Sequence, residues 1–290
     1  MSDYMMYKAA RFISRALPLP YSYALGRRIS DFCYLFDHKG RRCVISNIRH
    51  ILEHQGKKPD NAELARMARE NFRNFGRYIV DFFHYDRMTP NSVERLAEIE
   101  NPEALRLAHK AGRGVLLASA HLGNWELGGA ILHALGYPIT AVAYPQRTRK
   151  THELFQAQRR RRGVNILTFG EAARGVLRAV KRGDLIGVLS DRDYTLNHEP
   201  VLFFGAPARL PSSPARISMR TGAPILPTFL IRREAGRFLL RFYDPLFPEE
   251  FKSQNDLRLR LTAILESEVS RNPSQWYIFD DFWGWGQANG

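Results

Sequence analysis

The chain has 290 residues, of which 44% are hydrophobic and 25% are charged; this balance is typical of a folded globular protein and excludes a disordered or fibrous one. Its 43 lysines and arginines exceed its 29 acidic residues and give a formal net charge of +14, which favours an acidic partner: an anionic lipid surface, a phosphorylated substrate, an acidic carrier protein or nucleic acid. The alternative is a solvated basic surface. With Cys33 and Cys43 as its two cysteines, the chain cannot form a disulfide framework or a zinc ribbon.

The N-terminal region predicts two helical segments at the surface. From Tyr4 to Leu17, apolar residues recur on one side of a helix and Lys8, Arg11 and Arg15 lie on the other, a pattern typical of a membrane interface. A second segment, rich in aromatic and basic residues, runs from Tyr21 to Phe36. The cations and the lack of a cleavage signal exclude a secretory signal, and no apolar window of about 18 residues predicts a spanning helix. We expect this region to pack on the core, to lie on a membrane, or both.

The remainder of the chain predicts a long helix and then strands that alternate with helices. A 3.6-residue apolar period between Asn61 and Arg87 indicates a helix with one buried face. Short apolar runs predict strands at 114–119, 139–144, 164–169, 185–190, 200–204, 224–232 and 237–244. Helices are expected at 124–135, 149–162, 171–181, 212–221 and 253–271.

This alternation predicts the α/β fold class, with a largely parallel central sheet covered by helices. No internal repeat or linker divides the chain. We therefore expect residues 1–290 to form a single domain in which residues 1–36 form a membrane-docking helical segment. Functional side chains are then expected at the carboxyl ends of the strands.

The sequence SAHLGNWELGG, residues 119–129, places His121 at the carboxyl end of the first of these strands. Asn124 can cap the next helix, and the helix dipole favours an ionised carboxylate at Glu126 in its first turn. A carboxylate near a histidine raises the basicity of the imidazole, as a general base acting on a hydroxyl requires. These residues alone also fit a simpler interpretation, in which His121 orders a loop and Glu126 begins a helix.

Motifs of other enzyme classes are absent from the chain. It contains no G-x-S-x-G, H-E-x-x-H, G-x-x-x-x-G-K-[ST] or G-x-G-x-x-G. Serine hydrolase, zinc protease, P-loop and dinucleotide-binding functions thus lose their usual support. The other histidines have no metal-ligand spacing, and we interpret them as surface or packing residues.

Residues 121–126 read H-L-G-N-W-E, which resembles the H-x-x-x-x-[DE] motif of the lysophospholipid acyltransferase superfamily. With the preceding alanine, the motif is similar to that of the lipid A biosynthesis acyltransferases, a branch that includes lauroyl, myristoyl and phosphatidylinositol mannoside acyltransferases. Further blocks resemble this family in the same order: NFRNFGRYIVDFF (71–83), AYPQRTRK (143–150), QRRRRGVNIL (158–167), GVLSDRDY (187–194), FFGAPARLPSSPARISMRTGAPILP (203–227) and NPSQWYIF (272–279). The resemblance covers nearly the whole chain.

The resemblance implies a membrane-associated O-acyltransferase. It would move a fatty acyl chain from a thioester of acyl carrier protein or coenzyme A to a hydroxyl of a lipid A precursor or related glycolipid, without a cofactor or metal. His121 would be the general base in a direct transfer, with Glu126 or Asp191 as its supporting carboxylate. The implied location is the cytoplasmic face of the bacterial inner membrane, where the protein is peripheral or monotopic and rests on an anionic surface.

The same resemblance implies substrate-binding residues near the base. It places an arginine among residues 159–162, of which we choose Arg160 and expect the others to face outward. Gly123 and Asn124 are placed beside it as substrate-binding residues. Turn or packing requirements explain Gly123 equally well, and Asn124 is expected to cap the next helix and pack rather than to react.

The chain departs from the family pattern at two points. Asp191, Arg192 and Asp193 stand where the family usually has Asp-Gln or Asp-His, so Glu126, Asp191 and Asp193 all stay candidates for the carboxylate that supports His121. The usual N-terminal membrane helix is weak here, which favours docking at the surface.

Two other functions stay open at the level of sequence. The enzyme could acylate another phospholipid or a phosphatidylinositol mannoside in place of a lipid A precursor. Alternatively, the +14 charge could belong to a non-catalytic protein that binds membrane or nucleic acid. That alternative does not explain the ordered motifs, so we expect no nucleic acid partner.

Overall fold

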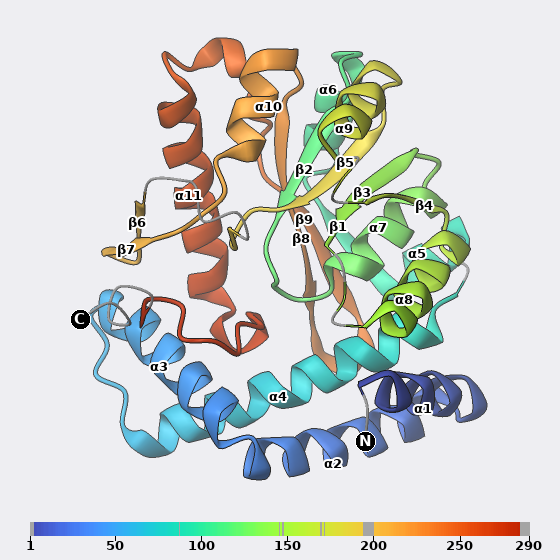
Figure 1. Ribbon diagram of the computed structural model, residues 1–290, viewed down its shortest axis with the longest axis vertical. Coiled ribbons are helices and arrows are strands. Elements are labelled where there is room, and N and C mark those ends of the chain that lie inside the picture. The colour runs from blue at the N-terminus through green and yellow to red at the C-terminus, as the bar shows by residue number, and fades with distance from the viewer. Residues whose placement is uncertain are drawn as a thin grey trace.

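The computed structural model describes residues 3–86, 88–144, 146, 148–168, 170, 172–193 and 200–284. The predicted element ends at Arg87, Phe169 and Glu171 lie outside these residues. A seven-stranded sheet with the strand order β1-β9-β8-β2-β5-β3-β4 forms the centre of the fold (Figure 1). Its strands are β1 (Ala97–Glu100), β2 (Val115–Ser119), β3 (Ile139–Ala143), β4 (Val164–Thr168), β5 (Leu185–Leu189), β8 (Ile225–Arg232) and β9 (Phe238–Phe242).

The sheet is parallel at every neighbouring pair except β8 and β9, which confirms the predicted α/β class. The strand expected at 200–204 forms as β6 (Val201–Phe203), but it pairs with β7 (Ala206–Ala208) in a separate hairpin. β1 has no counterpart in the predicted strands. Its sequence AEIE buries Ala97 alone, so it lacks the apolar run by which the other strands of the sheet are recognised.

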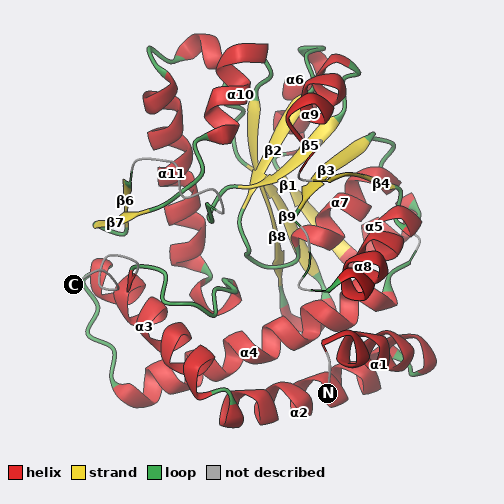
Figure 2. Ribbon diagram, viewed as in Figure 1, coloured by secondary structure: helices red, strands yellow, loops and turns green. Residues whose placement is uncertain are grey.

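Helices cover both faces of the sheet (Figure 2). One face packs against α5 (Pro90–Leu96), α6 (Pro102–Lys110) and α7 (Trp125–Ala134). The other packs against α9 (Ala172–Lys181), α10 (Ser213–Thr221) and α11 (Gln254–Arg271). Along β2, Leu117 belongs to the first of these cores and Leu116 to the second, so a slip of one residue would exchange the two faces. The two cores therefore fix the register that positions the ends of the strands.

Four N-terminal helices form a layer across one end of the sheet, at the bottom of Figure 1: α1 (Asp3–Ala16), α2 (Leu19–Phe36), α3 (His38–His54) and α4 (Asn61–His84). α2 and α4 pack closely because small residues meet at their crossing. Ser22, Gly26 and Ser30 lie one turn apart on α2, and a β-carbon added to Gly76 of α4 would collide with the Ser30 hydroxyl. No helix among the described residues has the length and apolar character needed to cross a membrane.

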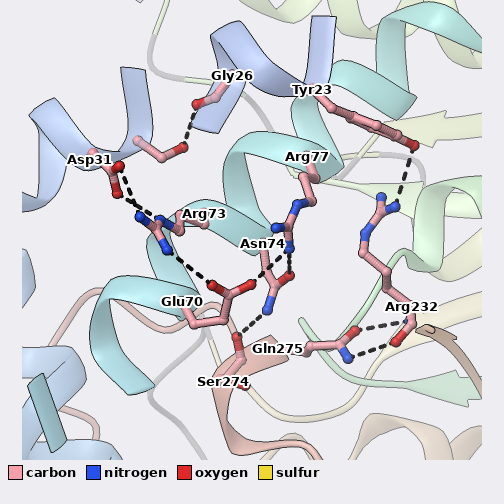
Figure 3. A network of polar contacts seen from close by, with 11 residues as sticks. Tyr23, Gly26, Asp31, Glu70, Arg73, Asn74, Arg77, Arg232, Ser274 and Gln275 are labelled. Atoms are coloured by element: carbon pink, nitrogen blue, oxygen red, sulfur yellow. Dashed lines mark hydrogen bonds and ion pairs between the residues drawn. The ribbon is translucent and has the colours of Figure 1, made fainter. Parts of the chain in front are cut away.

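The segment after α11 lies between this helical layer and the sheet. Three buried asparagines of α3 and α4 hold its backbone through their side-chain amides: Asn47 donates to the carbonyls of Ile278 and Asp280, Asn71 to that of Trp276 and Asn74 to that of Ser274. The last of these bonds is seen in Figure 3. The segment thus links the N-terminal helices to the loop after β2.

Candidate active site

His121 lies in the loop after β2, and Asp191 lies in the loop after the neighbouring strand β5. Nδ1 of His121 is 2.9 Å from Oδ1 of Asp191, and the backbone N–H of His121 donates to Oδ2 of the same carboxylate at 2.8 Å. Because both strands are parallel and paired through Ser119 and Leu189, their carboxyl ends are adjacent. The fold thereby joins two residues that are 70 positions apart.

The chemistry of this pair fixes the tautomer of the imidazole. An ionised carboxylate only accepts hydrogen bonds, so Nδ1 of His121 carries the proton, and Nε2 keeps the lone pair that a base requires. Burial of Asp191 by itself would raise the pKa of the carboxyl. Attraction to His121 and the hydrogen bonds that the carboxylate accepts nevertheless hold this pKa below its ordinary value. Asp191 is therefore a buried anion that orients the imidazole of His121.

Trp276 is a third member of this arrangement. Its indole N–H donates to Oδ2 of Asp191 at 2.8 Å, and the backbone N–H of the next residue, Tyr277, donates to the carbonyl of His121 at 2.7 Å. Both residues belong to the buried segment after α11. Sequence reasoning placed Trp276 in a family block, NPSQWYIF, but gave it no role. An indole donor has no sequence signal of its own, since most tryptophans serve as core residues.

Replacing Trp276 with phenylalanine keeps most of the buried ring and removes the indole donor. We expect kcat to fall roughly tenfold, because a hydrogen bond to a charged group contributes about 1.5–3 kcal/mol to the arrangement that it stabilises. Without this donor the negative charge of Asp191 is less compensated and attracts a proton on His121 more strongly. The acidic limb of the pH–kcat profile should therefore move to higher pH. The profile of Trp283→Phe serves as control. An unchanged profile for Trp276→Phe would contradict a positioning role.

Among the described residues, no hydrogen bond or ion pair joins Glu126 to His121; the partner of Glu126 is Arg159 of α8 (Arg149–Arg161). Nε of Arg159 lies 3.0 Å from Oε1 and 3.1 Å from Oε2, and Nη2 lies 2.5 Å from Oε1. Both side chains are largely buried, with 12% of the Arg159 side chain and 11% of the Glu126 side chain exposed. Nη1 of Arg159 is buried and has no hydrogen-bond partner among the residues that the structure describes. Glu126, the carboxylate of the H-x-x-x-x-[DE] motif, thus holds Arg159 in a position where Nη1 can still donate a hydrogen bond.

The arginine run of α8 is divided between two faces of the helix. Arg160, the residue expected to face the site, is exposed and does not line the cavity that contains His121. Arg159 lines that cavity. Arg162 is buried and donates to the carbonyls of Asp81, Phe82 and Tyr85 at the end of α4. Two arginines of the run therefore face inward, where one was expected.

Gly123 and Asn124 build the loop, and neither lines the cavity. Gly123 has a φ of +63°, and a β-carbon on it would collide with the carbonyl of Leu230. Asn124 caps α7 by accepting from the N–H of Leu127 at 3.1 Å and donates to Oδ2 of Asp81 at 2.8 Å. The structure thus gives both residues positions that shape the loop, where substrate contacts had been expected.

Asp81 anchors a buried network behind this loop. Its carboxylate forms an ion pair with Arg232 and accepts from the hydroxyl of Tyr23 at 2.5 Å. Figure 3 shows Arg232 between Tyr23 of α2 and Gln275, whose side chain bonds to the Arg232 backbone in both directions. The network joins α2, α4, β8 and the loop after β2, and sequence reasoning did not find it.

Asp193, the third candidate carboxylate, lines the cavity but has no recorded hydrogen bond to His121. Its neighbour Arg192 forms an ion pair with Asp280. Of the three candidates, Asp191 is the one that the structure places on the imidazole.

A cavity of about 830 Å³ opens beside His121. One part lies between α7 and the sheet and is lined by apolar side chains and by the two glycines of α7: Leu117, Gly128, Gly129, Leu132, Ile139, Val164, Leu230 and Leu240. Another part extends toward α9 and α10, where Leu177, Ile217, Arg216 and Arg220 line it. Aromatic residues from α1 and α4, including Tyr7 and Tyr78, line a third part. A base, a spare arginine donor and a long apolar space thus share one cavity.

The model of the bacterial lipid A biosynthesis acyltransferase family matches residues 2–284. The chain belongs to this family. It is therefore an acyltransferase, which agrees with the resemblance seen in the sequence motifs.

Individual relatives come from two groups of this family. A phosphatidylinositol mannoside acyltransferase of Mycolicibacterium smegmatis is 26% identical over 224 residues, which are 75% of this chain and 72% of that one. A lipid A biosynthesis palmitoleoyltransferase of Escherichia coli is 23% identical over 262 residues, which are 90% and 84% of the two chains. The solved 1-acyl-sn-glycerophosphate acyltransferase of Thermotoga maritima has a TM-score of 0.42 and 13% identity, covering 88% of this chain and 97% of that one.

Proposed function

We propose that this acyltransferase moves a fatty acyl chain from a carrier thioester to a hydroxyl of a glycolipid at a membrane surface. The observation that carries the proposal is the buried anion Asp191 on Nδ1 of His121, which leaves Nε2 as a base inside the cavity. The acceptor is a lipid A precursor or a related glycolipid such as a phosphatidylinositol mannoside, since relatives of both kinds match the chain.

The reaction needs no covalent enzyme intermediate. Nε2 of His121 takes the proton of the acceptor hydroxyl as its oxygen attacks the thioester carbonyl, and a tetrahedral oxyanion forms. The C–S bond then breaks, the ester stays on the acceptor, and the thiolate takes the proton back from the imidazolium. Asp191 stabilises the imidazolium between these two proton transfers, and Trp276 holds Asp191 in place.

The oxyanion requires a hydrogen-bond donor, and we assign that role to Arg159. Its Nη1 is buried and has no partner in the described part of the chain, while Nε and Nη2 donate to Glu126. Burial by itself would lower the pKa of Arg159, but the Glu126 carboxylate raises it, so the guanidinium stays charged. A fixed, charged donor in a water-poor cavity is suited to stabilise negative charge that develops during the reaction.

The acyl chain fits the part of the cavity between α7 and the sheet. A β-carbon on Gly128 would lie 3.6 Å from Leu230, and one on Gly129 would lie 3.6 Å from Val164, so a side chain larger than alanine would enter this space. The glycines of α7 thus keep an apolar channel open beside His121.

The outer surface of α1 and α2 is suited to a membrane. Ten of the sixteen large exposed apolar side chains in the described part of the chain lie between residues 5 and 36: Met5, Met6, Phe12, Leu17, Tyr21, Leu25, Ile29, Phe32, Leu35 and Phe36. α2 differs from an ordinary surface helix, because it turns Ser22, Gly26 and Ser30 inward and leaves large apolar side chains exposed, among them Leu25, Ile29, Phe32, Leu35 and Phe36. A concentration of exposed apolar side chains on two neighbouring helices is typical of an interaction site. We place the protein peripherally on the cytoplasmic side of the membrane, where carrier thioesters are available.

Replacing Phe12 and Phe32 with aspartate should abolish docking. The two rings are 73% and 60% exposed, and each contributes about 1.5–3 kcal/mol when it enters an apolar phase, so we expect vesicle binding to weaken at least about a hundredfold. Flotation with phosphatidylglycerol vesicles measures it. Leu202→Asp is the matched control, because Leu202 is 65% exposed but lies on β6, outside this face. Equal flotation of both variants would contradict the docking face.

The function itself is tested by transfer in a defined mixture. Purified protein, acyl-coenzyme A or acyl carrier protein thioester and a glycolipid in vesicles should yield an acylated glycolipid and one free thiol per acyl chain, measured by mass spectrometry and a thiol reagent. His121→Ala is the control for catalysis. Release of thiol without acylation of the glycolipid, or equal transfer by His121→Ala, would overturn the proposal.

A further inference from the structure

The cavity is lined by residues from helices that lie at different ends of the fold. Tyr7 of α1 and Tyr78 of α4 line it near the layer that carries the apolar docking face, whereas Arg216 and Arg220 of α10 line it far from that layer. In Figure 1, α10 is at the top of the long axis and α1 and α2 are at the bottom. A lipid acceptor that enters from the membrane and a water-soluble donor can therefore approach His121 from different ends.

Arg216 and Arg220 form a cationic pair at the end away from the membrane layer. They are four residues apart, so both lie on one face of α10. Both side chains are exposed, and among the described residues neither has a recorded carboxylate or other hydrogen-bond partner. Four other arginines, which are more buried, differ from this pair because each has a hydrogen-bond or ion-pair partner: Arg159, Arg162, Arg232 and Arg241. The positive charge of the pair is thus available to a ligand.

The part of the cavity near this pair is lined by apolar side chains and by a smaller number of polar ones, among them Asp193 and Ser213. Leu177 of α9 and Ile217 of α10 flank it, and Val188 of β5 lies close to the loop that carries Asp191. A ligand that fits here has an uncharged, extended arm and a phosphate at its outer end. The phosphopantetheine arm that acyl carrier protein and coenzyme A share has this chemistry, with the thioester at the inner end.

We propose that Arg216 and Arg220 bind the phosphate of the phosphopantetheine arm of the acyl donor. This assignment rests on the proposed function, which it deepens by giving the donor a defined entrance. Two guanidinium groups on one helix face can bind a phosphate through several charge-assisted hydrogen bonds. A phosphate of the glycolipid acceptor shares that chemistry, but the acceptor is anchored at the opposite end, so we commit to the donor.

The test compares two donors that differ in phosphate. Palmitoyl-coenzyme A carries the phosphates, and palmitoyl-pantetheine carries the same acyl chain and arm without them. For the double variant Arg216→Gln/Arg220→Gln, we expect KM for palmitoyl-coenzyme A to rise roughly tenfold or more, because hydrogen bonds between charged groups are lost. KM for palmitoyl-pantetheine and KM for the glycolipid should stay within about twofold of wild type. The matched control is Arg95→Gln/Arg260→Gln, which removes two exposed arginines that do not line the cavity.

Each other outcome has a defined meaning. An equal rise of KM for both donors overturns the phosphate assignment in favour of cavity shape, and a rise for the glycolipid alone assigns the pair to the acceptor. No change, or the same change in the control pair, leaves the arginines as a solvated surface and also overturns it.

A binding measurement separates this inference from the proposed function. Calorimetric titration with the thioether analogue of palmitoyl-coenzyme A needs no turnover. Weaker binding by Arg216→Gln/Arg220→Gln, with binding of the pantetheine thioether unchanged, supports the phosphate site even if no glycolipid is acylated. Conversely, glycolipid acylation with unchanged binding of the coenzyme A analogue overturns the site and leaves the proposed function intact.

Discussion

Asp191→Asn is expected to lower kcat by about 10²–10⁴-fold, the contribution that a positioned general base makes to proton transfer. Three donors converge on this carboxylate: Nδ1–H and the backbone N–H of His121, and the indole N–H of Trp276. An asparagine amide has one accepting oxygen and one donating nitrogen. If the amide nitrogen takes the place of Oδ2, it faces two N–H donors, those of the His121 backbone and the Trp276 indole. If the amide nitrogen takes the place of Oδ1, it donates to Nδ1 and moves the imidazole proton to Nε2. Either orientation removes the base or strains the loop.

The comparison with the other two candidate carboxylates decides the assignment. Glu126→Gln and Asp193→Asn leave the hydrogen bond between Asp191 and His121 in place. The rate constant for proton transfer to His121 should therefore fall far less in these two variants than in Asp191→Asn. Single-turnover rates with saturating donor and acceptor measure this for all three variants. A loss for Asp193→Asn that equals the loss for Asp191→Asn would sink the assignment of Asp191.

For Asp191→Asn we also expect a change in stability that depends on pH. The pKa of Asp191 in the folded protein lies below its ordinary value of 3.8. A depressed folded-state pKa stabilises the fold above the unfolded pKa, and this stabilisation is lost as pH falls through the folded pKa. The difference in Tm between wild type and Asp191→Asn should therefore be constant near neutral pH and shrink below pH about 4. Thermal melts from pH 7 downward measure it.

The sequence was sufficient for six of the seven strands of the sheet and for the position of His121 after β2, because these have strong local signals, whereas β1 has none. The run GVLLAS is apolar throughout and precedes H-L-G-N-W-E, so the strand, its carboxyl end and the loop could all be placed before the structure. The carboxylate that meets His121 could not be selected. Glu126 is close in sequence and part of the motif, whereas Asp191 becomes a neighbour only through the pairing of β2 with β5.

The sequence of α8 contains a signal that favours Arg159. Leu154 and Phe155 are buried, and one helical turn later the same face carries Gln158 and Arg159. Extending the apolar face by four residues thus selects Arg159 over Arg160. The outward apolar face of α2 had no such signal, because its inward face is built from small residues whose burial depends on Gly76 of another helix.

Glu126→Gln is expected to destabilise the fold by about 3–5 kcal/mol, since it leaves the guanidinium of Arg159 buried without its counter-charge. Both side chains are close to nine-tenths buried, so solvent screens the pair weakly. Arg159→Met should be similarly destabilising, because it isolates the Glu126 carboxylate. The free energy of unfolding from denaturant titration measures both losses. The exposed pair of Arg106 and Glu103 is the matched control, and Glu103→Gln should leave the free energy of unfolding close to that of the wild type, because solvent screens this pair.

The double variant Glu126→Gln/Arg159→Met separates the structural role of this pair from its catalytic one. It removes both charges, so much of the stability should return, giving a coupling free energy of about 2 kcal/mol or more in the double-mutant cycle. Activity should not return with it, because Nη1 of Arg159 is the donor assigned to the oxyanion; its loss should lower kcat by about 10²–10³-fold. If kcat recovers together with stability, Arg159 is a structural ion-pair partner, and the oxyanion must be stabilised by another group. If neither recovers, the two side chains hold α7 against α8 by packing as well as by charge, and the buried-charge explanation of the single variants is wrong.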